Sequence, residues 1–366
     1  MLTDQRLSEV TSTAPTVESV SALFFSRGKG RGHAIPDLEI LRELKQIDSG
    51  VDVQFVSYAT GAATFKAEGH SVVDLALPED NSFVDTIILA YRAIRDLQPK
   101  VVISHEEFGA LVAARLAHVP SIYIAAWLPP TGSVAAESLT SAEAIIMIER
   151  PGIFPSLPGL TARPEYVGPI LRKMKYSLED RPRLRNELGM EHDALAILVV
   201  QAGGWTEESA PICDTVLSAF LAVRRPSKRL YWLAGKDFDF LQKRTAGVPG
   251  VEVIEYCTPV ERLIVPCDVV ITKGTHQITL DAATLGVPSI SLSAGLNPID
   301  DALVPRIHNN VALMANAVDS LVLLEYIDTV TSATAARPPA WTRSDAKGAE
   351  RAAAIIVETI RRVVTE

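Results

Sequence analysis

Short apolar runs alternate with stretches of helical spacing along most of the 366-residue chain. In Phe108–Ala117, for example, Leu111 and Ala114 are spaced as on one face of a helix. The apolar runs are rich in Val and Ile, as is typical of strands in a parallel sheet. The expected strands are residues 22–26, 52–57, 71–75, 100–104, 121–125, 145–148, 165–167, 195–200, 229–234, 251–255, 268–272 and 288–292. Strands that alternate with helices predict the α/β class, here with two Rossmann-like doubly wound domains.

The chain is long enough for two hydrophobic cores, and its turn residues indicate where it divides. Gly168 and Pro169 interrupt a strand ahead of a charged segment. Residues 332–345 are rich in Ala, Pro, Ser and Thr, which predicts an extended linker, and an apolar stripe at helical period follows. We expect a flexible tail at 1–20, an N-terminal domain at 21–168, a C-terminal domain at 169–344, and a final helix in 345–366 that packs back on the N-terminal domain.

Charge and cysteine content narrow the function classes. A net charge of -9 argues against general binding of nucleic acid. Cys213, Cys257 and Cys267 lack a C-x-x-C spacing, so neither a disulfide framework nor a zinc site is expected, and a reducing cytoplasm fits. No apolar run reaches the ~18 residues that a membrane-spanning helix needs. We expect a soluble, cytoplasmic protein, for which a peripheral membrane contact stays open.

The loop after the first strand, "SRGKGRGHAIP", places glycines at 28, 30 and 32 directly before His33. This spacing matches neither the dinucleotide fingerprint G-x-G-x-x-G nor a P-loop. His33 stands at the expected helix start, on the carboxyl edge of the sheet, where open α/β folds bind ligands and where an imidazole can act as a general base. Gly30, Arg31 and Gly32 would then line an acceptor or phosphate site. The alternative is a tight strand-to-helix connection with solvated cations.

A second loop of interest lies in residues 267–292. A strand ends there, the turn Lys273-Gly274-Thr275 follows, and a helix runs towards Gly286. Backbone N–H groups at such a helix start can bind a diphosphate. Asp281, two turns further along, could bind a ribose diol if the ligand lies along the helix. The alternative is that Thr275 caps the helix and Asp281 is solvated.

These motifs, in this order, resemble the GT-B glycosyltransferases, in particular the group of UDP-glycosyltransferases and the lipid-linked N-acetylglucosaminyltransferase of peptidoglycan synthesis. Gly32–Pro36 matches their G-H-x-x-P loop, and Asp281–Pro288 resembles their E-A-x-x-x-G-x-P donor motif, with Asp in place of Glu. Asp300-Asp301 falls where the group carries a D-Q pair. The resemblance spans about residues 22–315 and implies two Rossmann-like domains that face a cleft.

The resemblance also implies a role for each matched position on the donor side. The C-terminal half would hold a nucleotide diphosphate sugar, usually UDP-linked in this group, and the N-terminal half the acceptor. The implied contacts are Gly203 and Gly204 to the phosphates, backbone groups around Tyr256 and Cys257 to the base, Gly274, Thr275, His276 and Gln277 to the diphosphate, Asp281 to the ribose, and Asp300 and Asp301 to the sugar hydroxyls.

The expected reaction is an inverting, metal-independent transfer without a cofactor. His33 would take the proton of an acceptor hydroxyl on a lipid, glycan or small molecule, and a carboxylate would orient His33. Glu106 is preferred over Glu107 for this role, and His105 beside them is taken as a loop residue. Two alternatives stay open: a nucleotide-sugar hydrolase or epimerase of the same fold, and a nucleotide-sugar-binding protein without catalysis.

Overall fold

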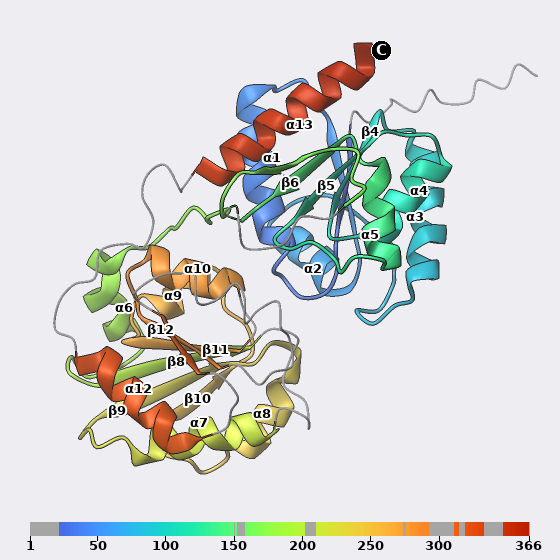
Figure 1. The fold of residues 1–366 in the computed structure, drawn as a ribbon. Helices are drawn as coiled ribbons and strands as arrows, with labels where there is room; N and C mark the ends of the chain where they lie inside the picture. Colours follow the sequence, from blue (N-terminus) through green and yellow to red (C-terminus); the bar gives the residue numbers. More distant parts are fainter. Residues whose placement is uncertain are drawn as a thin grey trace, which may run out of the picture.

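The computed structural model describes residues 22–149, 151, 158–201, 210–273, 276–292, 311–314, 319–332 and 347–365. These residues form two α/β domains, each built around one sheet (Figure 1). Every predicted strand is present, and its ends lie within one residue of the expected ones. The α/β class with two Rossmann-like domains is therefore confirmed.

The first sheet is parallel throughout and has the strand order β3-β2-β1-β4-β5-β6-β7. Its strands are β1 (Ala22–Ser26), β2 (Val53–Ser57), β3 (Val72–Asp74), β4 (Val101–His105), β5 (Ser121–Ala125), β6 (Ala144–Met147) and β7 (Pro164–Tyr166). The strand order reverses between β1 and β4, where Ser26 pairs with His105. Open α/β sheets bind ligands beyond the carboxyl ends of the strands at such a reversal.

Alternating side chains of β1 divide the first domain into two layers. Ala22 and Phe24 join a core with the helices on one face, and Leu23 and Phe25 join a core on the other. The first face carries α1 (Ala34–Ile47), α2 (Ala59–Ala67) and α13 (Gly348–Thr365), and the second carries α3 (Phe83–Leu97) and α4 (Phe108–Leu116), with α5 (Val134–Ser138) beside α4.

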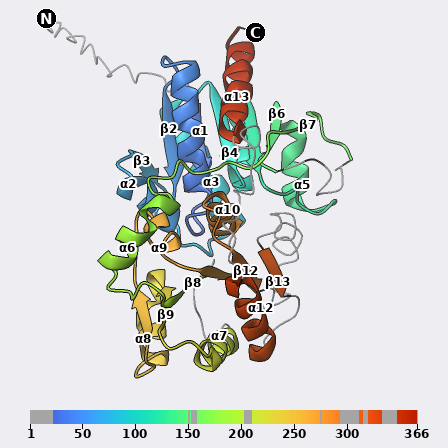
Figure 2. The ribbon, with the colours of Figure 1, turned by 90° about the vertical axis from the view of Figure 1, so that its left-hand side faces the viewer.

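The last helix, α13, lies along α1 although the two are far apart in sequence (Figures 1 and 2). Its apolar stripe, which includes Ala352, Ile356 and Ile360, is buried in the core of the first domain. Arg351 donates from Nη1 to the carbonyl oxygen of Val167 at 2.9 Å. The stretch expected as a linker, 332–345, lies outside the described residues apart from Ser332, which ends a helix.

The second sheet is also parallel, with the order β10-β9-β8-β11-β12-β13. Its strands are β8 (Leu195–Gln201), β9 (Lys228–Leu233), β10 (Val251–Ile254), β11 (Val269–Lys273), β12 (Ser289–Leu292) and β13 (Val311–Met314). Sequence patterning missed β13 ("VALM"), because the run is only four residues long and contains no Ile and a single Val. Both sheets thus share one topology, again with a reversal at the first strand.

Helices cover both faces of the second sheet. One layer holds α7 (Ala210–Ala222), α8 (Phe238–Arg244) and α12 (Ser320–Ser332), and the other holds α6 (Arg181–Glu187), α9 (Glu261–Ile264) and α10 (His276–Thr284). Figure 1 shows α9 and α10 on the side of this domain that is turned towards the first domain. Within the described residues, none of the helices is long and apolar enough to span a bilayer.

Candidate active site

The first loop brings His33 to the carboxyl edge of the first sheet. Gly28 packs closely against Tyr58, the residue after β2. A Cβ atom on Gly28 would lie 2.3 Å from the carbonyl oxygen of Tyr58. Gly30 has φ +68°, a left-handed backbone that glycine adopts without steric cost. These two features fix the path of the loop, and His33 occupies the N-cap position of α1. The imidazole is therefore presented at the point where the strand order reverses.

Glu106 follows β4 directly and faces His33. Its Oε2 lies 3.1 Å from Nε2 of His33 and accepts a hydrogen bond from Nε1 of Trp127 at 2.8 Å. Its Oε1 accepts from the backbone N–H of Ala126 at 3.1 Å. An ionised carboxylate can only accept, so Nε2 of His33 is the donor. Nδ1, which has no hydrogen-bond partner among the described residues, is then the nitrogen that can take a proton.

Hydrogen bonds and neighbouring positive charges keep Glu106 ionised. Burial raises the pKa of this carboxyl, but the His33 hydrogen bond and charge, the charge of His105 and the Trp127 donor outweigh it and bring the pKa to about 2. Glu106 also has φ +53°, a left-handed conformation that costs a non-glycine residue about 1–2 kcal/mol. The network is thus held in one arrangement, with a permanent negative charge beside the imidazole.

His105 is not the loop residue that the sequence suggested. It is the last residue of β4, it is 2% exposed, and its Nδ1 lies 2.6 Å from Oδ1 of Asp37 in α1. Burial lowers the pKa of His105, but the charge and hydrogen bond of Asp37 outweigh it and raise the pKa above the ordinary value. The rings of His105 and His33 meet edge to face, with centroids 4.8 Å apart. Sequence analysis did not single out Asp37. The available signal was its position four residues after His33 on a predicted helix, a spacing that places two side chains on one helix face.

Glu107, the other carboxylate weighed for orienting His33, points elsewhere. Its Oε2 accepts from the hydroxyl of Tyr58 at 2.9 Å, and burial raises its pKa. The preferred residue, Glu106, is therefore the one that contacts His33. The ligand atoms of His33, His105 and Glu106 lie within 4.8 Å of one another, a spacing that could admit a metal ion. As arranged here, hydrogen bonds to His33 and Trp127 already occupy Oε2 of Glu106.

Asp281 in α10 is buried, so the alternative of a solvated helix residue is wrong. It is 1% exposed, its Oδ1 accepts from Nε2 of Gln277 at 3.0 Å, and its Oδ2 lies 3.3 Å from Nε of Arg172. Burial raises the pKa of Asp281 to about 6, with Glu261 and Glu39 raising it further and Arg172 and Gln277 opposing. Among the described residues, Oδ2 has no hydrogen-bond partner. That oxygen is buried and keeps an unused capacity to accept a hydrogen bond.

A contact between the two domains joins the first loop to the loop after β10. The guanidinium carbon of Arg31 lies 3.8 Å from the ring centroid of Tyr256. The ring of Tyr256 is 46% exposed, and its hydroxyl accepts from Oγ1 of Thr258 at 2.8 Å. The neighbouring Cys257 is half-buried. The Arg31–Tyr256 contact brings the His33 loop to the segment expected to read the base.

Several expected site residues lie where the structure says nothing of them. The positions outside the described residues are Gly203, Gly204, Gly274, Thr275, Asp300, Asp301 and, as a side chain, His276.

The segment that resembles the donor motif, Asp281–Pro288, lies within the described residues. Gly286 has φ +73°, and the N–H of Val287 reaches the carbonyl oxygen of Ala282 at 2.9 Å, which closes α10.

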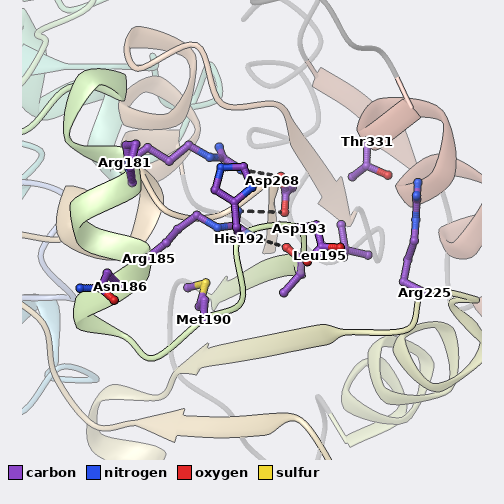
Figure 3. Close-up of a pocket in the computed structure, with 12 residues that line it drawn as sticks. Arg181, Arg185, Asn186, Met190, His192, Asp193, Leu195, Arg225, Asp268 and Thr331 are labelled. Carbon is purple, nitrogen blue, oxygen red and sulfur yellow. Dashed lines mark hydrogen bonds and ion pairs between the residues drawn. The ribbon is translucent and has the colours of Figure 1, made fainter.

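A cavity of about 560 Å³ opens at the opposite, amino-terminal edge of the second sheet (Figure 3). Arg181 and Arg185 line it, but their guanidinium groups are already bound, Arg181 to Asp268 and the carbonyl of Cys267, Arg185 to the carbonyls of Pro266 and Ala194. These contacts tie α6 to the starts of β8 and β11. The cavity is therefore separate from the residues around His33 and Asp281.

The comparisons with known proteins agree with the fold. No protein-family model matches the chain. A protein of Methanopyrus kandleri, named an uncharacterized glycosyltransferase, is 25% identical over 87% of this chain and 98% of its own. The calicheamicin glycosyltransferase CalG4 has a TM-score of 0.62 at 18% identity, over 94% of this chain and 99% of its own. A putative UDP-N-acetylglucosamine 2-epimerase from Listeria monocytogenes has 0.64 at 14%, over 94% and 98%. The chain shares the two-domain fold of these structures.

Proposed function

We propose that the protein is a glycosyltransferase that moves a sugar, with inversion, from a nucleotide diphosphate sugar to an acceptor hydroxyl. The observation that carries the proposal is the hydrogen bond between His33 and the buried Glu106 at the strand-order reversal of the first sheet. It provides an oriented imidazole, whose buried Nδ1 has no hydrogen-bond partner among the described residues, at the edge where this fold class binds ligands. UDP is the expected nucleotide, as in the name of the Listeria relative.

In the proposed reaction, the acceptor oxygen attacks the anomeric carbon from the face opposite the diphosphate. A bond forms between that oxygen and the carbon, the bond from the carbon to the diphosphate oxygen breaks, and the electron pair leaves with the diphosphate. The hydroxyl proton passes to Nδ1 of His33. Glu106 stabilises the resulting imidazolium, since it stays ionised throughout the physiological range. General-base catalysis of this kind contributes roughly 10²–10⁴-fold to the rate.

On the donor side, we assign the ribose to Asp281 and the diphosphate to the start of α10. A carboxylate oxygen without a partner can accept hydrogen bonds from the ribose hydroxyls. The N–H groups and dipole at the start of α10 would meet the negative charge that grows on the leaving diphosphate, so no metal is needed for this step. The acceptor class, whether lipid, glycan or small molecule, is left to experiment.

A second candidate function is epimerisation or hydrolysis of the nucleotide sugar. The Listeria 2-epimerase fits the fold as well as the transferase CalG4 does, with TM-scores of 0.64 and 0.62. Such an enzyme would share the donor site and would need no acceptor. Transfer is favoured because His33, at the end of the loop that contacts the donor domain, is oriented as a base for a second substrate.

The test has two steps. Calorimetric titration with UDP, GDP and dTDP identifies the nucleotide, and Asp281→Ala should weaken its binding by about 1.5–3 kcal/mol, the value of hydrogen bonds to a charged group. Incubation with UDP-sugars, with and without a panel of acceptors, then separates the reactions. Product that forms only with acceptor supports transfer; hydrolysis or epimerisation without acceptor supports the second candidate. Nucleotide binding without any turnover would leave a binding protein and overturn both.

A further inference from the structure

The interdomain linker, residues 167–177 after β7, is held by buried carboxylates from both domains. The backbone N–H of Lys173 donates to Oε1 of Glu39 in α1 at 3.2 Å, and the N–H of Lys175 donates to Oε1 of Glu261 in α9 at 2.9 Å. Glu39 is 8% exposed and Glu261 is fully buried. One carboxylate belongs to each domain, so these bonds fix the linker against both.

The side chain of Arg172, on this linker, reaches the proposed ribose site. Its Nε lies 3.3 Å from Oδ2 of Asp281, and both side chains are largely buried, at 17% and 1% exposure. Neither Nε nor Oδ2 has a hydrogen-bond partner among the described residues. The contact is therefore an ion pair without a well-aligned hydrogen bond, and Oδ2, although buried, keeps the capacity to accept one.

The other charges around Asp281 oppose its ionisation. Glu261 from α9 and Glu39 from α1 are negative, and Gln277 from α10 itself is a neutral donor. Arg172 is the cation among the described residues that offsets them. A buried carboxylate beside two like charges protonates readily once its cation is removed.

We propose that Arg172 is a positioning residue that holds Asp281 ionised and aims its Oδ2 at the nucleotide ribose, so that the interdomain linker takes part in nucleotide binding. This role rests on the proposed function, which supplies the ligand. Without Arg172, the pKa of Asp281 would rise further, so that more of this carboxyl would be protonated at neutral pH. It would then donate where the site needs an acceptor and would lose the stronger, charge-assisted hydrogen bonds to the ribose.

The consequence is a pH dependence that purely structural damage would not produce. Burial and the two neighbouring carboxylates already bring the pKa of Asp281 to about 6. Removal of the Arg172 charge raises this pKa further, so that affinity should fall at pH 7 and recover as the pH rises. A variant that merely disturbed the packing of the linker would weaken binding by the same factor at every pH.

The experiment measures UDP affinity by calorimetry at pH 6.5, 7.5 and 9 in wild type, Arg172→Gln, Arg172→Lys and Lys173→Gln. Lys173 is the matched control, because only its backbone N–H is bound and its side chain is exposed. Arg172→Gln should lose about 10- to 100-fold at pH 6.5–7.5 and recover most of it at pH 9. Arg172→Lys, which keeps the charge, should lose less, and Lys173→Gln should bind as wild type does.

Unchanged affinity in Arg172→Gln, or a loss of the same size at every pH, would overturn this role and leave the proposed function intact. Wild-type protein that binds none of UDP, GDP and dTDP would instead overturn the proposed function, and this role with it. Circular dichroism checks the fold of each variant. If Arg172→Gln does not fold, Arg172→Met, which removes the charge and keeps much of the side-chain volume, takes its place in the same comparison with Lys173→Gln, and equal affinity of these two at every pH would overturn the role.

Discussion

Two buried carboxylates, one in each domain, have opposite acid–base behaviour. Glu106 has a pKa of about 2 and Asp281 a pKa of about 6, although burial raises both. Glu106 has three hydrogen-bond donors, from His33, Trp127 and the backbone of Ala126. Asp281 has one aligned donor, Gln277, and two negative neighbours. Because both groups are buried, the hydrogen-bond donors and the neighbouring charges set the difference: His33 and His105 favour the ionised form of Glu106, and Glu261 and Glu39 disfavour that of Asp281.

The difference separates two kinds of site. Glu106 is a completed network whose charge is fixed before any ligand arrives, which suits a group that must stabilise an imidazolium at once. Asp281 is incomplete, with one oxygen that has no hydrogen bond among the described residues. Such an oxygen is costly to keep buried and gains most from a ligand hydroxyl. Glu106 thus supplies a fixed charge for the proposed chemistry, and Asp281 supplies an oxygen that can accept a further hydrogen bond for the proposed binding.

Removal of His33 from the hydrogen-bond network of Glu106 should have the largest effect on catalysis. His33→Ala takes away the proposed base, so kcat should fall by about 10²-fold or more, while UDP affinity stays nearly unchanged because the proposed nucleotide site lies on the other domain. His33→Asn should fail almost as badly, since an amide can donate to Glu106 but cannot accept a proton at neutral pH. Steady-state kinetics and calorimetry measure the two quantities. Near wild-type turnover in His33→Ala would move the base elsewhere, with His105 as the next residue to test.

Neutralisation of Asp281 should change how the free energy of unfolding depends on pH. The folded pKa, about 6, lies above the ordinary 3.8, so the folded state holds this proton more tightly than the unfolded chain. The protein therefore loses stability as pH rises from 3.8 through about 6, by about 3 kcal/mol in total. Asp281→Asn escapes this loss and should become more stable than wild type above pH 6, relative to pH 4. Urea unfolding from pH 4 to 8 tests this; a constant difference between the two proteins would contradict it.

Neighbouring glutamates allow a matched test of the network. Glu106→Gln should lower kcat by roughly 10- to 100-fold, the usual cost of losing a partner that orients a reactive group. Glu107→Gln should have little effect, because Glu107 bonds to Tyr58 and not to His33, and burial already favours its neutral form. Kinetics of both variants at saturating donor and acceptor make the measurement. Equal losses would show that the site needs both carboxylates, contrary to the geometry.

The two carboxylates also show how far the sequence could reach. The strands, their alternation with helices and the loops after the first strands follow from local pattern, and Glu106 and Glu107 are candidates because both lie at the tip of the fourth strand. The pairing of His105 with Asp37 and of Arg172 with Asp281 joins residues 68 and more than a hundred positions apart. No periodicity encodes such contacts; they follow from the strand order and from the path of the linker. Strand β13 was missed for a different reason, because its apolar run is only four residues long.

The contact between Arg31 and Tyr256 joins the domain of Glu106 to the domain of Asp281, and its removal should have the smallest effect on UDP binding. A cation over an aromatic ring at a partly exposed site is worth about 0.5–1 kcal/mol. Arg31→Ala should therefore weaken UDP binding about two- to fivefold, because the loop after β10 loses the partner that holds it near the first domain. Tyr256→Phe keeps the ring and should change less than Tyr256→Leu. In a double-mutant cycle of Arg31→Ala with Tyr256→Leu, the losses should fall short of additivity by about the value of the contact. Full additivity would mean that Arg31 and Tyr256 act independently, and that the contact does not couple the base-side loop to His33.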